Sequence, residues 1–91
     1  MIVEFEWDEE KRRSNLEKHR LDFVVAQRLF DGRPLFTTIN LDHDEPRWVS
    51  TGVDDYRHYT VVWTERYEKI RIISFRRARD AEERNYRQLH G

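Results

Sequence analysis

The sequence contains no cysteine, only three glycines and two prolines, and no long hydrophobic run. The absence of cysteine excludes disulfides and metal sites built from thiolates. No glycine-rich loop of the kind that cradles phosphates is present, so we expect no nucleotide cofactor. No apolar segment approaches the roughly 18 residues of a membrane-spanning helix, and no basic stretch followed by an apolar one indicates a signal peptide. We therefore expect no membrane partner, and the simplest location is cytoplasmic.

A length of 91 residues predicts one domain, covering residues 1–91. Hydrophobic residues make up 37% of the chain and charged residues 38%, which lies toward the polar end of the range for globular proteins. The apolar residues nevertheless fall in periodic clusters, so the chain is expected to fold.

The periodicity of the sequence predicts the order of the secondary-structure elements. Alternating apolar and acidic residues predict a strand over residues 2–6. Two helices follow, one from Asp8 to about His19 and one from Asp22 to about Phe30, each preceded by an aspartate that can cap it. Further strands are expected over residues 35–41, 47–53, 58–64 and 69–77, before a C-terminal helix. This order, β-α-α-β-β-β-β-α, predicts an α+β fold with two N-terminal helices and a C-terminal helix packed on a mainly antiparallel sheet.

The first helix has few apolar residues, and Leu16 is its expected core residue. Lys11, Asn15 and either Lys18 or His19 share one face, because they are three to four residues apart. A solvated face is the favoured interpretation for the two lysines.

A basic segment lies near the C-terminus. Residues 66–91 contain eight Lys/Arg and four Asp/Glu, a net charge of +4, whereas the whole chain has a net charge of -1. A local basic patch is typical of a site for a phosphate-bearing partner, and a strand and helix with surface ion pairs is the alternative.

Strand periodicity places the residues of this segment on two faces. Alternation predicts Ile70, Ile72, Ser74 and Arg76 on one face of the last strand, and Arg71, Ile73, Phe75 and Arg77 on the other. Only one of Arg76 and Arg77 would then face a ligand, and the other would pair with a helix carboxylate.

Arginine chemistry is the strongest functional signal. The planar guanidinium matches phosphate oxygens in two-point contacts and can stabilise the charge of a phosphoryl transition state. A metal-free ribonuclease needs such arginines together with groups that transfer protons. The available proton-transfer groups are His19, Glu45, Glu82 and Tyr86, and the sequence alone does not distinguish among them. No histidine has the spacing of a zinc site, and the loop of residues 42–46 is interpreted as a solvated acidic loop.

Several motifs resemble the BrnT family of toxins. The start of the chain, WDEEKRRSNLEKHRLDFVVAQRLFD, is similar to the opening of that family, and RWVSTG, VVWTER and RIISFRRA are similar to its later strands. Glu82 and Tyr86 match positions in its last helix. In the opening segment the matching positions are Trp7, Asp8, Lys11, Asn15, Lys18, His19, Leu21, Phe23, Ala26 and Phe30. In the later strands they are Arg47, Gly52, Thr64, Arg66, Arg71, Ile72, Ile73, Ser74, Arg76 and Ala78.

The resemblance implies a RelE-like fold and the toxin of a type II toxin–antitoxin system. The toxin would be a metal-independent endoribonuclease that cleaves RNA, either on the ribosome or free, and so inhibits translation. Arg47, Arg76 and Arg77 would bind the phosphate, and His19, Glu82 or Tyr86 would assist proton transfer. A non-catalytic module that only holds its antitoxin partner is the alternative.

The resemblance also implies a partner. A cognate BrnA-like antitoxin with a ribbon–helix–helix DNA-binding domain would form a hetero-oligomer with the chain, and promoter DNA would be contacted only through it. A DNA-binding regulator acting alone is disfavoured by the net charge and by the absence of a helix-turn-helix pattern.

The chain departs from the family pattern at two positions. Arg20 stands where glycine is frequent, and a non-glycine residue costs roughly 1 kcal/mol if the left-handed conformation is kept. Arg79 stands where a capping threonine is common, so Asp80 is expected to take over the cap and shift the helix start by one residue.

Overall fold

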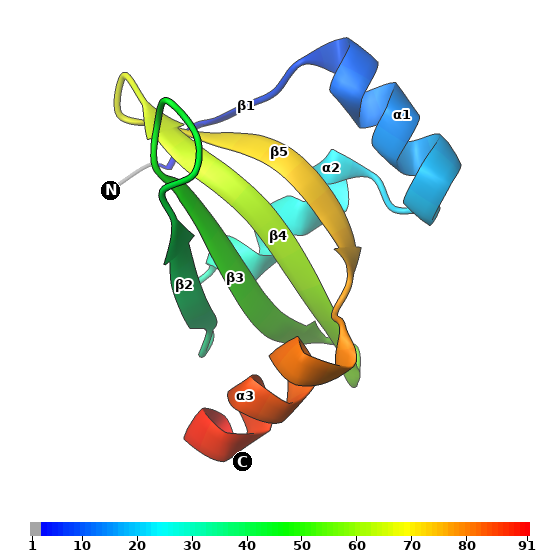
Figure 1. Ribbon diagram of the computed structural model, residues 1–91. Helices are drawn as coiled ribbons and strands as arrows, with labels where there is room; N and C mark the ends of the chain where they lie inside the picture. Colours follow the sequence, from blue (N-terminus) through cyan, green and yellow to red (C-terminus); the bar gives the residue numbers. More distant parts are fainter. Residues whose placement is uncertain (1–2) are drawn as a thin grey trace.

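The computed structural model describes residues 3–91 and contains one sheet with helices around it (Figure 1). The elements are β1 (Phe5–Glu6), α1 (Glu9–His19), α2 (Phe23–Ala26), the 3₁₀ helix η1 (Gln27–Phe30), β2 (Phe36–Asn40), β3 (Arg47–Asp54), β4 (Arg57–Arg66), β5 (Lys69–Arg77) and α3 (Asp80–His90). This order confirms the predicted α+β class.

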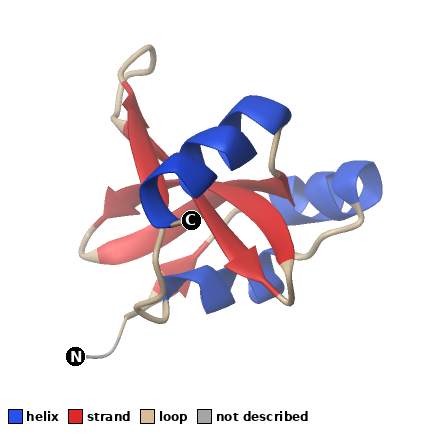
Figure 2. Cartoon of the chain, turned by 90° about the horizontal axis from the view of Figure 1, so that it is seen from below, coloured by secondary structure: helices blue, strands red, loops and turns tan. Residues whose placement is uncertain are grey.

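The five strands form one mixed sheet in the order β1-β5-β4-β3-β2. Strand β1 is parallel to β5, and the other three pairs are antiparallel, which confirms the prediction of a mainly antiparallel sheet. Helix α2 and η1 cover one face of the sheet, and α3 crosses the other face near one end (Figures 1 and 2). Helix α1 lies beside β5, beyond the short stretch that β1 covers.

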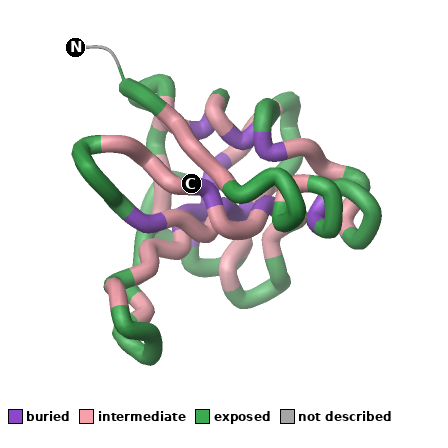
Figure 3. Tube along the Cα trace, turned by 90° about the horizontal axis from the view of Figure 1, so that it is seen from above, coloured by how far each residue is buried: buried purple, intermediate pink, exposed green. Residues whose placement is uncertain are grey.

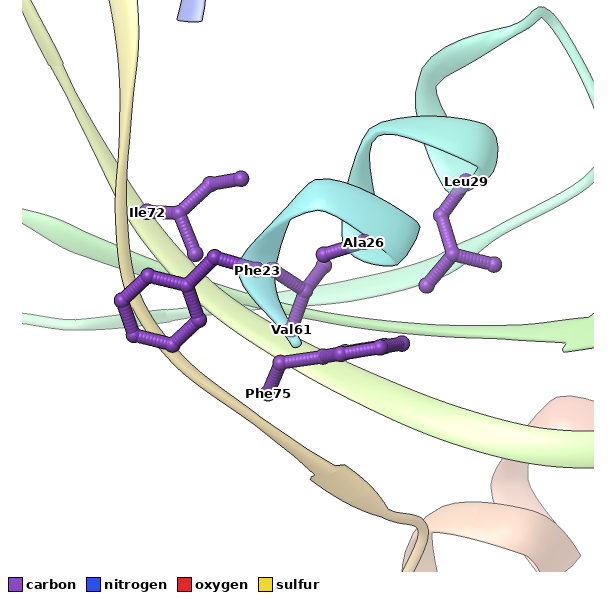
Figure 4. Close-up of a cluster of buried hydrophobic side chains, with 6 residues drawn as sticks. All are labelled: Phe23, Ala26, Leu29, Val61, Ile72 and Phe75. Carbon is purple, nitrogen blue, oxygen red and sulfur yellow. The ribbon is translucent and has the colours of Figure 1, made fainter. Parts of the chain in front are cut away.

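The hydrophobic core fills the space between α2 and the sheet. Six fully buried residues form it, and they come from α2, η1, β4 and β5: Phe23, Ala26, Leu29, Val61, Ile72 and Phe75 (Figure 4). The buried positions follow the inner side of α2 and the central strands, whereas much of the surface of α1 and α3 is exposed (Figure 3). On the opposite face of the sheet, α3 therefore packs with few buried apolar residues, and Tyr86 is its buried residue.

A β-bulge in β5 changes the predicted faces of this strand. Val62 pairs with Ser74 and Trp63 pairs with Ile72, so Ile73 is an extra residue that has no partner in the ladder. Such a residue inverts the alternation beyond it. Ile72 and Phe75 consequently lie in the same core, and the prediction that they occupy opposite faces is wrong. Arg76 and Arg77 follow the bulge and still point to opposite sides.

Two predictions for the N-terminal part need correction. Strand β1 contains only Phe5 and Glu6; Ile2 lies outside the described residues, and Val3 is exposed. Leu16, the expected core residue of α1, is 42% exposed, and Asn15 is the buried residue of this helix. The helix boundaries at Asp8 and His19 are confirmed.

The two departures from the family pattern have different outcomes. Arg20 keeps the left-handed conformation, with φ of 59° and ψ of 28°, and ends α1. Helix α3 begins at Asp80, so Arg79 occupies the N-cap position and the predicted cap at Asp80 is wrong. The Glu82 carboxylate instead accepts a hydrogen bond from the Arg79 backbone N–H at 2.8 Å.

Within residues 3–91, no helix is both long enough and apolar enough to cross a membrane.

Candidate functional site

The sheet face that α3 partly covers is hollowed into a cleft of about 610 Å³, here called the main cleft. Its floor is formed by one residue from each of three neighbouring strands, and its rim by β5, the start of α3, the loop after β2 and the first residue of β3. The floor residues are Thr38, Val49 and Val62, and the charged or titratable residues of the rim are Asp42, His43, Arg47, Arg76, Arg79 and Glu82. Three arginines thus line one open cleft.

Arg76 is held in the main cleft by Glu82. The guanidinium donates to both carboxylate oxygens, at 2.7 Å and 3.0 Å, and the two side chains are only 13% and 20% exposed. Burial favours the neutral acid, but the hydrogen bonds from Arg76 and from the Arg79 backbone outweigh it and lower the pKa of Glu82. Glu82 is therefore a poor proton acceptor, and its role is to fix the position of Arg76.

A pair of buried hydroxyl groups supports the same carboxylate. Thr60 donates to Glu82 Oε1 at 3.1 Å, and the hydroxyls of Thr51 and Thr60 are 2.8 Å apart. Both threonines are fully buried under α3. The hydrogen bonds connect the start of α3 to the middle of the sheet, so the position of α3 and that of Arg76 depend on each other.

Arg47 lies in the main cleft without such a partner. Among residues 3–91, the Nε atom of Arg47 is the only buried side-chain nitrogen or oxygen atom without a hydrogen-bond partner. Arg47 also lines an adjoining hollow, together with Arg66 and residues 43–45 of the acidic loop. A buried donor without a partner is unfavourable in the free protein, and an anionic ligand would compensate the charge of this arginine.

A second cleft, of about 270 Å³, lies between α1 and β5 and is called the α1 cleft. It is lined by Lys11, Ser14, Asn15, Lys18, His19, Ile73 and Ser74. The pKa of His19 is lowered from its usual value by burial first and by the positive charges of Lys18 and Arg76 second. His19 is therefore neutral at pH 7, and it lies within electrostatic range of the arginine of the main cleft.

Asn15 fixes α1 against the edge of the sheet. Its side-chain amide donates to the carbonyl of Phe75 at 2.8 Å and accepts from the N–H of Phe75 at 3.0 Å. It also donates to the carbonyl of Leu21 at 3.0 Å. The Asn15 amide makes the two backbone hydrogen bonds that a neighbouring strand would otherwise make at this edge of β5. These bonds position the face of α1 that contains His19.

The structure brings together some of the residues that the sequence predicted and leaves others apart. Arg47, Arg76 and Glu82 line the main cleft, and His19 lines the α1 cleft beside it. The Arg77 guanidinium lies over the Tyr59 ring, 5.6 Å from its centroid, on the core side of the sheet. Tyr86 is buried against His58 and His90 and lines neither cleft. The arginine that pairs with a helix carboxylate is thus the same one that faces the cleft, which alternation did not predict.

Sequence reasoning missed several residues of the two clefts. His43 and Arg79 line the main cleft, and Lys11 and Lys18 line the α1 cleft. The spacing of Lys11, Lys18 and His19 on one helix face was the available signal for the second cleft. Glu45, a candidate for proton transfer, pairs with Arg66 at 3.6 Å and lies outside the main cleft. The described residues contain no group of three or more His, Asp or Glu side chains that would hold a metal ion.

This fold and these clefts define a small α+β protein with a site suited to an anionic, phosphate-like group. The family model described as the ribonuclease toxin BrnT of type II toxin–antitoxin systems matches residues 7–82, and the chain belongs to this family. It is accordingly a toxin with ribonuclease activity, and a toxin of this type has an antitoxin partner. No curated protein matches the chain.

Proposed function

We propose that residues 1–91 form a single toxin domain with a RelE-like fold, which acts in the cytoplasm as a metal-independent endoribonuclease and inhibits translation. The observation that carries this proposal is that Arg47 and Arg76 line the same cleft and that His19 lines the cleft beside it. These are the groups that RNA cleavage without a metal requires: two cations for the phosphate and a base for the 2′-hydroxyl.

In the proposed reaction the RNA 2′-hydroxyl attacks the adjacent phosphate. His19 takes the proton of this hydroxyl, the 2′-oxygen bonds to phosphorus, and the bond from phosphorus to the 5′-oxygen breaks. The leaving oxygen takes a proton from solvent, which gives a 2′,3′-cyclic phosphate and a free 5′-hydroxyl. Arg76 and Arg47 bind the non-bridging oxygens, whose negative charge increases in the transition state. Glu82 holds Arg76, and Arg77 and Tyr86 take no part in the reaction.

The antitoxin is proposed to be BrnA-like, with a ribbon–helix–helix domain that binds promoter DNA for the whole complex. An acidic segment of this antitoxin would neutralise the toxin by covering the arginines of the main cleft. A near-neutral toxin fits this arrangement, because the DNA contacts then belong to the antitoxin.

Expression of this chain alone tests the proposed function. We expect growth arrest and a fall in bulk translation, both prevented by co-expression of the antitoxin. The purified protein should cleave RNA in the presence of EDTA and produce 2′,3′-cyclic phosphate ends. A folded protein that neither arrests growth nor cleaves RNA would contradict the proposal and favour the non-catalytic binding module.

The pH dependence of cleavage tests the role of His19. The base must be neutral, so kcat/KM should rise with pH, and the midpoint of this rise should lie below the usual histidine value of 6.5, because burial first and the charges of Lys18 and Arg76 second lower the pKa of His19. Replacing His19 with glutamine is expected to lower kcat by about 10²–10⁴-fold and to remove this acid limb. His43→Gln is the matched variant. An acid limb that persists in His19→Gln and disappears in His43→Gln would assign the base to His43 instead.

A further inference from the structure

The α1 cleft has a composition that the cleavage chemistry does not explain. Lys11, Ser14 and Lys18 lie at positions i, i+3 and i+7 of α1 and therefore share one face of the helix. Ser74 completes the cleft from β5, and no carboxylate lines it. The Ser74 hydroxyl donates to the Asn15 side-chain oxygen at 3.4 Å, so the free donors of the cleft are the two ammonium groups and the hydroxyl of Ser14. Groups of both kinds donate hydrogen bonds to phosphate oxygens.

The two lysines are not neutralised by the protein. Among residues 3–91 neither Lys11 nor Lys18 belongs to an ion pair. Arg12, which lies between these lysines in the sequence, is by contrast paired with both Glu9 and Asp22. The positive charge of the α1 cleft is consequently available to a ligand.

The geometry of β5 relates the α1 cleft to the main cleft. Ser74 and Arg76 are two residues apart beyond the bulge, so they lie on the same face of the strand and about 7 Å apart along it. Ser74 lines the α1 cleft, and Arg76 lines the main cleft. This separation is comparable to the length of one extended nucleotide.

We propose that the α1 cleft is a second phosphate subsite, which binds the phosphate next to the one held by Arg76 and selects an extended single strand of RNA. This inference rests on the proposed ribonuclease function and specifies its substrate. The in-line attack of a 2′-hydroxyl needs a backbone that leaves the A-form helix, and two successive phosphates bound along β5 hold the strand extended in this way.

An acidic peptide of the antitoxin is a less suitable ligand for this cleft. Ile73 is the one apolar residue that lines it, and bound peptide segments usually depend on apolar side chains anchored in pockets. The hydroxyl of Ser14 and the ammonium groups of Lys11 and Lys18 match the oxygens of a phosphate group instead. We therefore assign the α1 cleft to RNA.

Binding of non-cleavable RNA tests the subsite without requiring catalysis. The probes are fluorescent 2′-O-methyl oligonucleotides of random base sequence, two and four nucleotides long, and fluorescence anisotropy gives their Kd. The test protein is Lys11→Ala/Lys18→Ala. The control is Arg13→Ala/Arg84→Ala, which removes the same charge from exposed positions outside both clefts.

We expect wild type and the control to bind the four-nucleotide probe at least about tenfold more tightly than the two-nucleotide probe. The lysine variant should lose most of this difference, and the slope of log Kd against log salt should fall by about 1. A difference that persists in the lysine variant, or that is absent in wild type, would overturn the subsite. So would a lysine variant that weakens antitoxin binding but leaves RNA binding intact.

Cleavage of the matching unmodified RNAs separates this inference from the proposed function. A length-dependent affinity without cleavage would overturn the ribonuclease mechanism and support the subsite as an RNA-binding site. Cleavage that proceeds equally well on both lengths would support the ribonuclease and overturn the subsite.

Discussion

Replacing Arg76 with alanine is expected to lower kcat/KM for RNA cleavage by about 10²–10³-fold, the usual effect of removing one group that stabilises transition-state charge. The same change should destabilise the fold by about 2 kcal/mol, because Glu82 loses its two-point partner and remains largely buried. Activity assays on the purified protein and denaturant unfolding measure the two effects.

Arg77→Ala is the matched control, since it removes the same side chain from the next position on the opposite face of β5. Its guanidinium lies over Tyr59 and lines neither cleft, so kcat/KM should stay within about threefold of wild type. Activity that survives Arg76→Ala and is lost in Arg77→Ala would reverse the assignment of the two arginines.

The stability effect of Arg76→Ala should depend on pH. The pKa of Glu82 is lowered in the folded protein, so the charged pair stabilises the fold fully above the unfolded value of 4.5. This stabilisation is lost as the pH falls through the folded pKa of Glu82. The difference in unfolding free energy between wild type and Arg76→Ala should therefore be largest near neutral pH and decrease below pH 4.5. A difference that does not change with pH would contradict the role of the charged pair.

The elements of this fold follow from local signals, which is why the sequence predicted them. Asp8 and Asp22 cap the two N-terminal helices through hydrogen bonds to backbone N–H groups within a few residues. The strands β4 and β5 contain β-branched and aromatic residues at positions that packing against α2 requires. Each of these features depends on neighbours in the sequence, so a single chain reveals them.

The features that position the site depend on contacts across the fold. No local sequence pattern indicates the bulge at Ile73, because the segment RIISFRR is equally compatible with a regular strand whose side chains alternate between the two faces. Asn15 replaces a strand at the edge of β5, 60 residues further along the chain, whereas the local pattern favoured Leu16 as the buried residue. A pair between an arginine of β5 and a carboxylate of the last helix was predicted, but it was expected at the arginine that faces away from the ligand. Arg76 both lines the main cleft and pairs with Glu82, and this depends on the position of α3 over the sheet.

The second large effect is expected at Arg47 and has the opposite sign for stability. Arg47→Met should raise the free energy of unfolding by about 1 kcal/mol, because methionine keeps the apolar stem and removes a buried N–H that has no partner. The same change should lower kcat/KM by about 10²-fold, because one of the two cations facing the scissile phosphate is lost. Thermal unfolding and cleavage assays on one preparation measure both quantities.

Arg66→Met is the control for Arg47→Met, because Arg66 lines the adjoining hollow, is half exposed and is already paired with Glu45. Neither stability nor kcat/KM should change much in this variant, since a surface ion pair contributes about 0–1 kcal/mol. If Arg47→Met loses both stability and activity, Arg47 supports the fold rather than the substrate. A gain in stability with a loss of activity would instead mean that the free toxin retains an uncompensated charge for its ligand. Arg76 would then be the cation that the fold holds in position, and Arg47 the one that the substrate neutralises.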